Sequence, residues 1–199
     1  MTLTVNTIEV RELAEKTLET NRLILEALRR SHAEELFDVL ADERLFRFIP
    51  ADPPASVESL AQRFEQLERR GPPGGKELWL NWVMRLKSDG SCVGRVEATV
   101  LPDRTALLAY ELGAAHWGRG LATEACREAT HALFLYFRVE QIVADVDTRN
   151  AASLRLLERL GFERGPVTRG ADHFKGAVSD ELRWTLPRPA SFDAFHRRG

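Results

Sequence analysis

Three strand patterns follow one another in the middle of the chain, and this run constrains the fold more than any other feature. Within residues 79–87, the apolar side chains that share one strand face are Leu80, Trp82, Met84 and Leu86. Alternation of this kind is typical of a half-buried strand. Asp89-Gly90 is a hairpin turn signal, and residues 93–100 and 105–113 have the composition of two further strands. We therefore predict an antiparallel meander for this region.

Helix and strand patterns on both sides of the meander indicate a larger mixed sheet. The segments predicted before it are a strand at 22–28, a helix after Ser31 and a helix at 56–69. Those predicted after it are a helix at 121–137, a strand at 141–147, a helix at 151–160 and strands near Phe162 and at 181–186. Ser31 can cap the helix that follows it, with Glu34 placed for a capping box, while Asn150 and Gly161 can cap the two ends of the helix at 151–160. This order predicts an α/β fold with helices on both faces of the sheet.

Composition excludes several classes of protein. The 199 residues are 44% hydrophobic and 29% charged, with a formal net charge of -2, as in ordinary globular domains. No basic field is available for a nucleic acid. Cys92 and Cys126 are the only cysteines, too few for a disulfide framework, and they do not form a zinc motif. Because no signal peptide or membrane-length apolar stretch is present, we expect a soluble cytoplasmic protein with no membrane partner.

A glycine-containing stretch between a predicted strand and a predicted helix is the best candidate for a ligand site. Residues 116–125 are HWGRGLATEA. A helix N-terminus offers free backbone N–H groups, and glycine lets a phosphate approach them closely, so this stretch suits a pyrophosphate. The spacing alone is equally compatible with a simple tight turn. It matches neither the Rossmann fingerprint nor the Walker loop.

Two motifs together resemble the GNAT superfamily of N-acetyltransferases. Residues 116–125 are similar to the acetyl-CoA pyrophosphate motif of that family, and residues 150–162, NAASLRLLERLGF, resemble its second hallmark. The opening RLIL at 22–25 and the later Lys175-Gly176 and Asp180 resemble the RimJ/RimL-like branch. The resemblance implies a mostly antiparallel sheet containing one splayed parallel strand pair. It covers residues 20–187, which leaves 1–19 as a weakly helical extension and 188–199 as a tail.

The resemblance also implies where acetyl-CoA would bind. The cofactor would lie between strands 106–113 and 141–147, with its pantetheine arm against the backbone. Its pyrophosphate would contact the backbone of the glycine loop. The implied cofactor-binding residues are Leu112, Gly113, Trp117, Gly118, Arg119, Gly120, Leu121, Ala122, Thr123 and Asn150. No metal is expected, since no His/Cys cluster is present to hold one.

The catalytic residues are less constrained by the motifs. Many relatives carry, at the position of Leu107, a glutamate that acts as the general base. Glu111 lies on the same strand face, so it is the first candidate for the base here. Glu97 and an ordered water are the alternatives. Ser153 matches the position from which a hydroxyl can reach the departing thiolate. Asn150 and Ser153 are equally well explained as parts of a helix cap.

The predicted reaction is direct attack of a primary amine on the thioester of acetyl-CoA, through a tetrahedral intermediate. The acceptor is either a protein N-terminus or a small-molecule amine. The alternative is a GNAT-fold module that binds acetyl-CoA without catalysis. The sequence leaves the oligomeric state open, a homodimer included.

Overall fold

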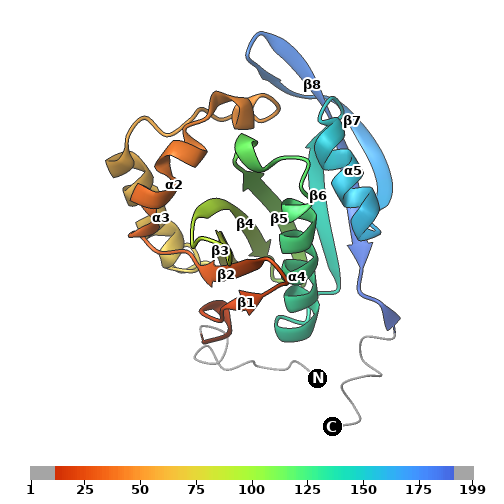
Figure 1. The fold of residues 1–199 in the computed structure, drawn as a ribbon. Coiled ribbons are helices and arrows are strands. Elements are labelled where there is room, and N and C mark those ends of the chain that lie inside the picture. The colour runs from red at the N-terminus through yellow and green to blue at the C-terminus, as the bar shows by residue number, and fades with distance from the viewer. Residues whose placement is uncertain (1–11, 191–199) are drawn as a thin grey trace.

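The computed structural model describes residues 12–190, which form one eight-stranded sheet flanked by helices (Figure 1). The strands are β1 Leu18–Glu19, β2 Leu23–Ala27, β3 Leu78–Leu86, β4 Cys92–Val100, β5 Thr105–Leu112, β6 Gln141–Asp147, β7 Glu163–Phe174 and β8 Ala177–Pro187. The α-helices are α2 His32–Leu40, α3 Val57–Glu68, α4 Leu121–Tyr136 and α5 Ala151–Leu160, with short 3-10 helices η1 Glu43–Phe46 and η2 Ala114–His116. The strand order is β1-β2-β3-β4-β5-β6-β8-β7. The α/β fold predicted from the sequence is therefore confirmed.

Two separate cores lie on the two faces of the sheet. The larger core packs α4 and α5 against one face, and its sheet residues include Leu80, Trp82, Met84 and Trp184. The smaller core packs α2 and α3 against the opposite face (Figure 1), around Val83. Both faces of the sheet centre are thus covered. We use the names α4–α5 face and α2–α3 face for these two sides.

The predicted meander forms β3, β4 and β5, each pairing antiparallel with the next. The turn at Asp89-Gly90 is built as its sequence indicates. Asp89 Oδ1 accepts hydrogen bonds from the backbone N–H and the hydroxyl of Ser91, at 2.9 and 2.7 Å. Gly90 has a φ of 75°, a conformation that glycine adopts without steric cost. Local turn chemistry therefore sets the register of this hairpin.

The parallel pair β5–β6 separates after only three residues. Thr105, Ala106 and Leu107 pair with β6, but β5 continues to Leu112 and β6 to Asp147 without further pairing. β6 remains attached to β8 over its whole length. A gap therefore opens between β5 and β6 within the sheet, and this is the splayed pair that the resemblance implied.

The C-terminal hairpin is longer than the sequence predicted. β7 and β8 run for 12 and 11 residues and turn at Lys175-Gly176, where φ is positive at both residues. The hairpin projects past the end of β6 in Figure 1. Most of β7 is exposed and polar, so it carries no alternation of hydropathy. Its strand conformation comes from backbone pairing with β8.

The predicted capping box at Ser31 is wrong. Ser31 adopts a helical conformation and its side chain caps nothing. The turn begins earlier, since the N–H of Arg29 donates to Nδ1 of His32 at 2.9 Å. The helix at 56–69 does begin with a capping box, which Ser56 forms with Ser59.

The described part of the N-terminal segment packs against the rest of the domain. Residues 12–14 are helical, Ala14 and Leu18 are buried in the larger core, and β1 pairs with β2. Residues 1–11 and 191–199, which include most of the predicted extension and tail, lie outside the described residues. Between residues 12 and 190, no helix is long and apolar enough to cross a membrane.

Candidate active site

The glycine loop leads from the end of β5 into α4, beside the gap between β5 and β6. Gly120 is the N-cap of α4 and has a φ of 76°, and Gly118 has a φ of 73°. Both values lie in the left-handed region that favours glycine. No side chain caps α4, and the first N–H groups of a helix lack intrahelical partners. The loop therefore presents uncapped donors and the positive end of a helix dipole to an anion.

Hydrogen bonds from Thr20 and Arg22, in the turn between β1 and β2, fix the position of this loop. Glu124, in the first turn of α4, accepts hydrogen bonds from the Thr20 hydroxyl at 2.6 Å and from the backbone N–H of Arg22 at 2.7 Å. The Arg22 side chain pairs with Glu124 at 2.6 Å and donates to the carbonyl of Arg119 at 2.8 Å. Burial raises the pKa of Glu124, but the hydrogen bonds from Thr20 and Arg22 outweigh it and lower that pKa. One carboxylate thus joins the sheet edge to the loop.

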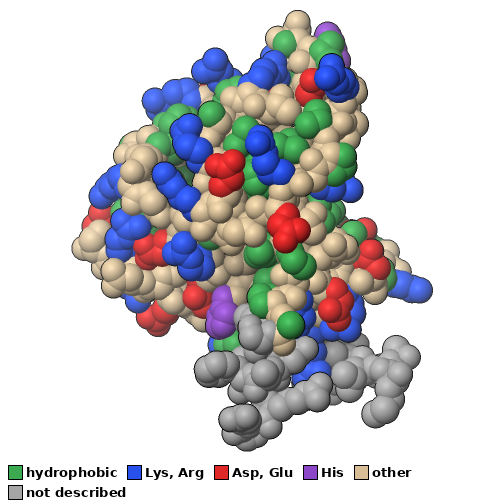
Figure 2. Space-filling model, turned by 90° about the vertical axis from the view of Figure 1, so that its right-hand side faces the viewer, with side chains coloured by type: hydrophobic (Ala, Val, Ile, Leu, Met, Phe, Trp, Pro, Cys, Tyr) green, Lys and Arg blue, Asp and Glu red, His purple; other side chains and the backbone are tan. Residues whose placement is uncertain are grey.

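A groove of about 440 Å³ lies next to the loop. Its lining residues are Asn21, Arg22, Gly120, Thr123, Glu124, Arg127 and Arg159. Three arginines and one glutamate give the lining an excess of positive charge. The side of the molecule that carries α5 and the β7–β8 hairpin also displays many Lys and Arg side chains (Figure 2). The groove is therefore suited to an anionic group that continues outward from the loop.

The backbone of β5 offers donors to the gap beyond Leu107, the last residue that pairs with β6. The N–H of Gly113 donates to Val93 on β4 at 2.8 Å, and its carbonyl accepts from His116. Because successive N–H groups of a strand point to opposite edges, the N–H of Leu112 faces the gap. The Leu112 carbonyl is occupied by Nε1 of Trp117 at 2.6 Å. Of the two backbone partners predicted for the pantetheine arm, Leu112 has its N–H available, whereas both groups of Gly113 are engaged.

Asn150 and Ser153 lie across the gap, at the start of α5. Asn150 Oδ1 accepts from the N–H of Ser153 at 3.2 Å, so the predicted cap is formed. Asp147 stabilises the turn between β6 and α5. Its carboxylate accepts from Arg149 and, at 2.7 Å, from the buried hydroxyl of Ser179. The Arg149 side chain is the main reason that the pKa of Asp147 falls to about 2.

Glu111 lies on the α2–α3 face beside the gap, together with Leu107, as strand alternation predicted. It is not free, because Arg95 on β4 donates to Glu111 at 2.6 Å and lies 3.0 Å from Glu97. The Arg95 side chain is only 7% exposed. Burial opposes its charge, but the two carboxylates outweigh burial and raise its pKa. Glu111 and Glu97, the two predicted bases, therefore share the buried guanidinium of Arg95. The formal charge of these three side chains is -1.

Glu181 on β8 is a third carboxylate, which the sequence analysis did not identify. It pairs in register with Asp147 and lies on the same sheet face as Glu111, on the other side of the gap. Burial, and next the charges of Asp145 and Asp172, raise the pKa of Glu181. No local spacing signals this group, because β7 was not predicted at its observed length and the β6–β8 pairing joins distant segments.

Comparison with known proteins gives the same picture. Residues 22–163 match the model of the GNAT acetyltransferase domain. The chain is 28% identical to the uncharacterized N-acetyltransferase YoaA of Bacillus subtilis (strain 168), over 86% of this chain and 97% of the relative.

Solved structures share the fold. The ribosomal-protein-S5-alanine acetyltransferase of Vibrio fischeri superposes with a TM-score of 0.77 at 20% identity, over 88% of this chain and 98% of the other. Mycobacterium smegmatis RimJ, solved with CoA-disulfide, gives 0.74 at 21% identity, over 87% and 88%.

Proposed function

The chain is an acetyltransferase that belongs to the GNAT family, and on this premise we propose that it is of the RimJ/RimL-like branch and transfers the acetyl group of acetyl-CoA to a primary amine. One observation carries the proposal. The uncapped start of α4, with Gly118 and Gly120 in left-handed conformations, stands beside the gap between β5 and β6. A long thioester cofactor with a charged end needs both features in this arrangement.

The cofactor residues would act in order along the molecule. The pantetheine arm would lie in the gap, where the N–H of Leu112 and the side-chain amide of Asn150 can donate. The loop at 117–123 would hold the pyrophosphate through its backbone. Arg127 and Arg159, in the neighbouring groove, would bind the remaining phosphate of CoA as charge-assisted partners.

The chemistry would proceed by direct attack. A neutral amine would attack the thioester carbonyl, whose oxygen the N–H of Leu112 would polarise as an oxyanion donor. We keep Glu111, acting through a water, as the first candidate for the base. To accept a proton it must give up its ion pair with Arg95. Glu181 has a raised pKa and therefore a greater tendency to hold a proton, which makes it the second candidate.

The acceptor would be a protein N-terminus or a small-molecule amine. A similar solved structure is named for acetylation of the alanine of ribosomal protein S5, which favours a protein N-terminus as the first acceptor to test. An α-amine has a pKa of about 7.7–8.0. About a tenth to a sixth of it is therefore already neutral at pH 7, which lowers the demand on a protein base.

The decisive test is cofactor binding in a loop variant. Acetyl-CoA at about 100 times its Kd should stabilise the protein by about 2.7 kcal/mol, which raises the Tm by about 5–10 °C in a domain of this size. Gly120→Val should abolish that shift, because valine is strained at a φ of 76° and must move the loop.

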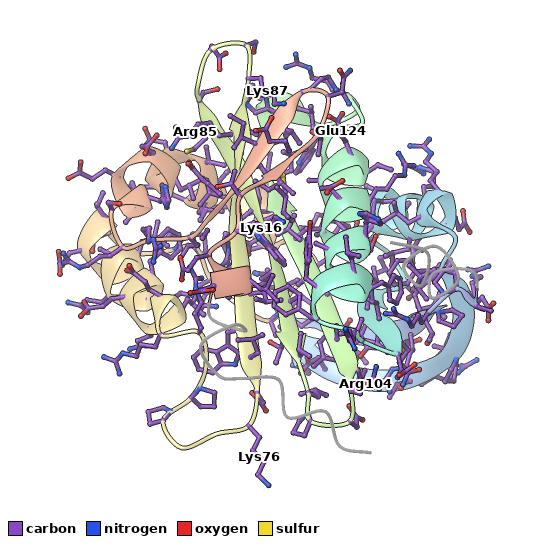
Figure 3. The ribbon with its side chains drawn as sticks, turned by 90° about the horizontal axis from the view of Figure 1, so that it is seen from below. Lys16, Lys76, Arg85, Lys87, Arg104 and Glu124 are labelled. Atoms are coloured by element: carbon purple, nitrogen blue, oxygen red, sulfur yellow. The ribbon has the colours of Figure 1, made fainter. Side chains whose placement is uncertain are left out.

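Gly74→Val is the matched control. Gly74 has a φ of 69° with nothing near its Cβ, so the backbone strain is similar. Figure 3 shows the labelled Lys76, two residues from Gly74, at the opposite end of the molecule from Glu124. This variant should keep the full acetyl-CoA shift. Stabilisation by NAD or ATP, with none by acetyl-CoA, would refute the proposal. Binding without turnover on a panel of amines would favour a non-catalytic module.

A further inference from the structure

Tyr110 lies on β5 at the gap, and neither cofactor binding nor the proposed chemistry uses it. It stands three residues beyond Leu107, the last residue of β5 that pairs with β6. Its strand partner on β4 is Val96, and its side chain packs against the larger core. Its side chain therefore lies on the α4–α5 face, opposite to Glu111. On this face it meets the helices that flank the gap.

The hydroxyl of Tyr110 is buried; within residues 12–190 no group meets it in full hydrogen-bonding geometry, and the Ser153 side chain is its candidate partner. Cys126 of α4 and Ser153 of α5 are its neighbours. Burial raises the pKa of Tyr110, the Cys126 thiol adds to that effect, and the Ser153 side chain opposes it. A buried hydroxyl without a partner is destabilising, and phenylalanine would fill the same space without that penalty. The hydroxyl is therefore explained best by a ligand that accepts a hydrogen bond from it.

The position of the hydroxyl indicates which part of the ligand it meets. Ser153 occupies the first turn of α5, directly across the gap from β5. Leu112, two residues along β5, presents the N–H that would polarise the thioester carbonyl. Two hydroxyls, from Tyr110 and Ser153, thus stand on the α4–α5 side of the predicted reaction centre, whereas the candidate bases lie on the α2–α3 side. The two hydroxyls are therefore separated from the carboxylates that would receive the amine proton.

We propose that Tyr110 donates a hydrogen bond to the sulfur of the acetyl-CoA thioester and to the CoA thiolate as it leaves, with Ser153 as a second donor. This inference rests on the proposed function. When the tetrahedral intermediate collapses, the carbonyl re-forms and the C–S bond breaks, leaving its electron pair on sulfur. The amine proton goes to the base or to water. The thiolate is held by the two hydroxyls and takes its proton from solvent.

Tyr110 acts as a hydrogen-bond donor and does not give up its proton. An ordinary tyrosine has a pKa of about 10, and burial raises the pKa of Tyr110, so its phenol is a poor proton donor to a thiolate. The same burial keeps the phenol neutral over the working pH range and strengthens its bond to an anion in a site of low dielectric constant.

The test is Tyr110→Phe, with Tyr136→Phe as the matched control. The chain has only these two tyrosines, and Tyr136 stands at the far end of α4, under Lys16. Loss of a hydrogen bond to a developing charge should lower kcat about 10- to 100-fold. The Kd for acetyl-CoA should change less than about threefold, because the bond matters mostly in the transition state. Tyr136→Phe should behave as wild type.

A spectroscopic readout separates this role from a structural one. The thiol of bound CoA is titrated through the ultraviolet absorbance of its thiolate. Its pKa should be about 1–2 units higher in Tyr110→Phe than in the wild type, which is the same 10- to 100-fold effect seen at equilibrium. Ser153→Ala should raise it less, and the two changes together should raise it most. Binding of desulfo-CoA, which lacks the sulfur, should be unaffected by either substitution.

The outcomes are distinct. A wild-type kcat in Tyr110→Phe would overturn the inference. So would a lowered kcat with no change in the ionisation of bound CoA, because that result would assign Tyr110 a packing role only. Both results leave the proposed function intact. A wild-type enzyme that neither binds acetyl-CoA nor acetylates any amine would overturn the proposed function as well.

Discussion

Glu124 supports the most quantitative prediction, because a single carboxylate links the phosphate loop to the sheet edge. Glu124→Gln keeps the size of the side chain and removes its charge. The carboxylate is 17% exposed and Arg22 is 44% exposed, so the ion pair itself contributes about 0.5–1 kcal/mol. The hydrogen bonds from the Thr20 hydroxyl, at 2.6 Å, and from the Arg22 backbone N–H, at 2.7 Å, go to a charged acceptor, and weakening them adds about 1 kcal/mol. The total cost is about 2 kcal/mol in the free energy of unfolding.

Denaturant or thermal unfolding measures this cost directly. A loss of about 2 kcal/mol lowers the Tm of a domain of this size by about 4–8 °C. Glu58→Gln is the matched control, since Glu58 also lies in the first turn of a helix but is 66% exposed, and its partners are the exposed Arg30 and Gln62. It experiences the same helix dipole without the network, so its loss should cost less than about 0.5–1 kcal/mol.

The pH dependence provides a second check. The pKa of Glu124 is lowered in the folded state below its ordinary value of 4.5. A carboxyl group of this kind stabilises the fold fully above its unfolded pKa and loses that contribution as the pH falls through the folded pKa. The stability difference between wild type and Glu124→Gln should therefore be full at pH 7 and shrink below about pH 4.5.

A double-mutant cycle with Arg22→Leu tests the coupling itself. We expect the Arg22 side chain and Glu124 to couple by about 0.5–1 kcal/mol, the contribution of their ion pair, since Arg22→Leu retains the backbone N–H bond. Equal costs for Glu124→Gln and Glu58→Gln, or a coupling energy within about 0.3 kcal/mol of zero, would show that the helix dipole alone explains Glu124. The reasoning from the network would then be refuted.

Three further predictions concern the gap and its walls. If Glu111 is the base, Glu111→Gln should lose most of its rate near neutral pH and recover it at high pH, where the acceptor amine is already neutral. If Glu111→Gln instead keeps the wild-type pH–rate profile and Glu181→Gln loses its rate near neutral pH, the base is Glu181. Asp147→Asn should cost about 1–3 kcal/mol through its buried hydrogen bonds. Because the pKa of Asp147 is lowered to about 2, chemical denaturation should show this contribution intact above about pH 4 and lost as the pH falls toward 2; a pH-independent difference would contradict the ionised state. Lys175 donates to the carbonyls of Phe46, Ile49 and Ala51 at 2.5–3.2 Å, so Lys175→Met should speed hydrogen exchange in residues 46–51 and leave the Kd for acetyl-CoA unchanged, whereas unaltered exchange would show that other contacts hold this loop.

Local features of the sequence determined the elements that carry the cofactor loop. Alternation and the Asp89-Gly90 turn predicted the meander, which the structure confirms in β3, β4 and β5. The N-cap at Asn150 was predicted and is formed. These features depend on residues within a few positions of one another, where backbone preferences and short-range hydrogen bonds decide the conformation. The pairing of the two family hallmarks added the splayed strands, which no local pattern could have predicted.

Contacts between distant segments decided the rest. β7 is polar and exposed, so only its pairing with β8 makes it a strand. The ion pair of Arg95 with Glu111 depends on the register of β4 against β5. The network at Glu124 joins residues 102 positions apart, and the neighbourhood of Tyr110 and Ser153 depends on how α5 packs against β5. The burial and the charged partners of these side chains depend on segments that come together only on folding. The periodicity of the sequence therefore does not predict them. The sequence by itself thus determined where the glycine loop forms, and only the tertiary structure decided which carboxylates are paired with arginine and which hydroxyl is buried beside the gap.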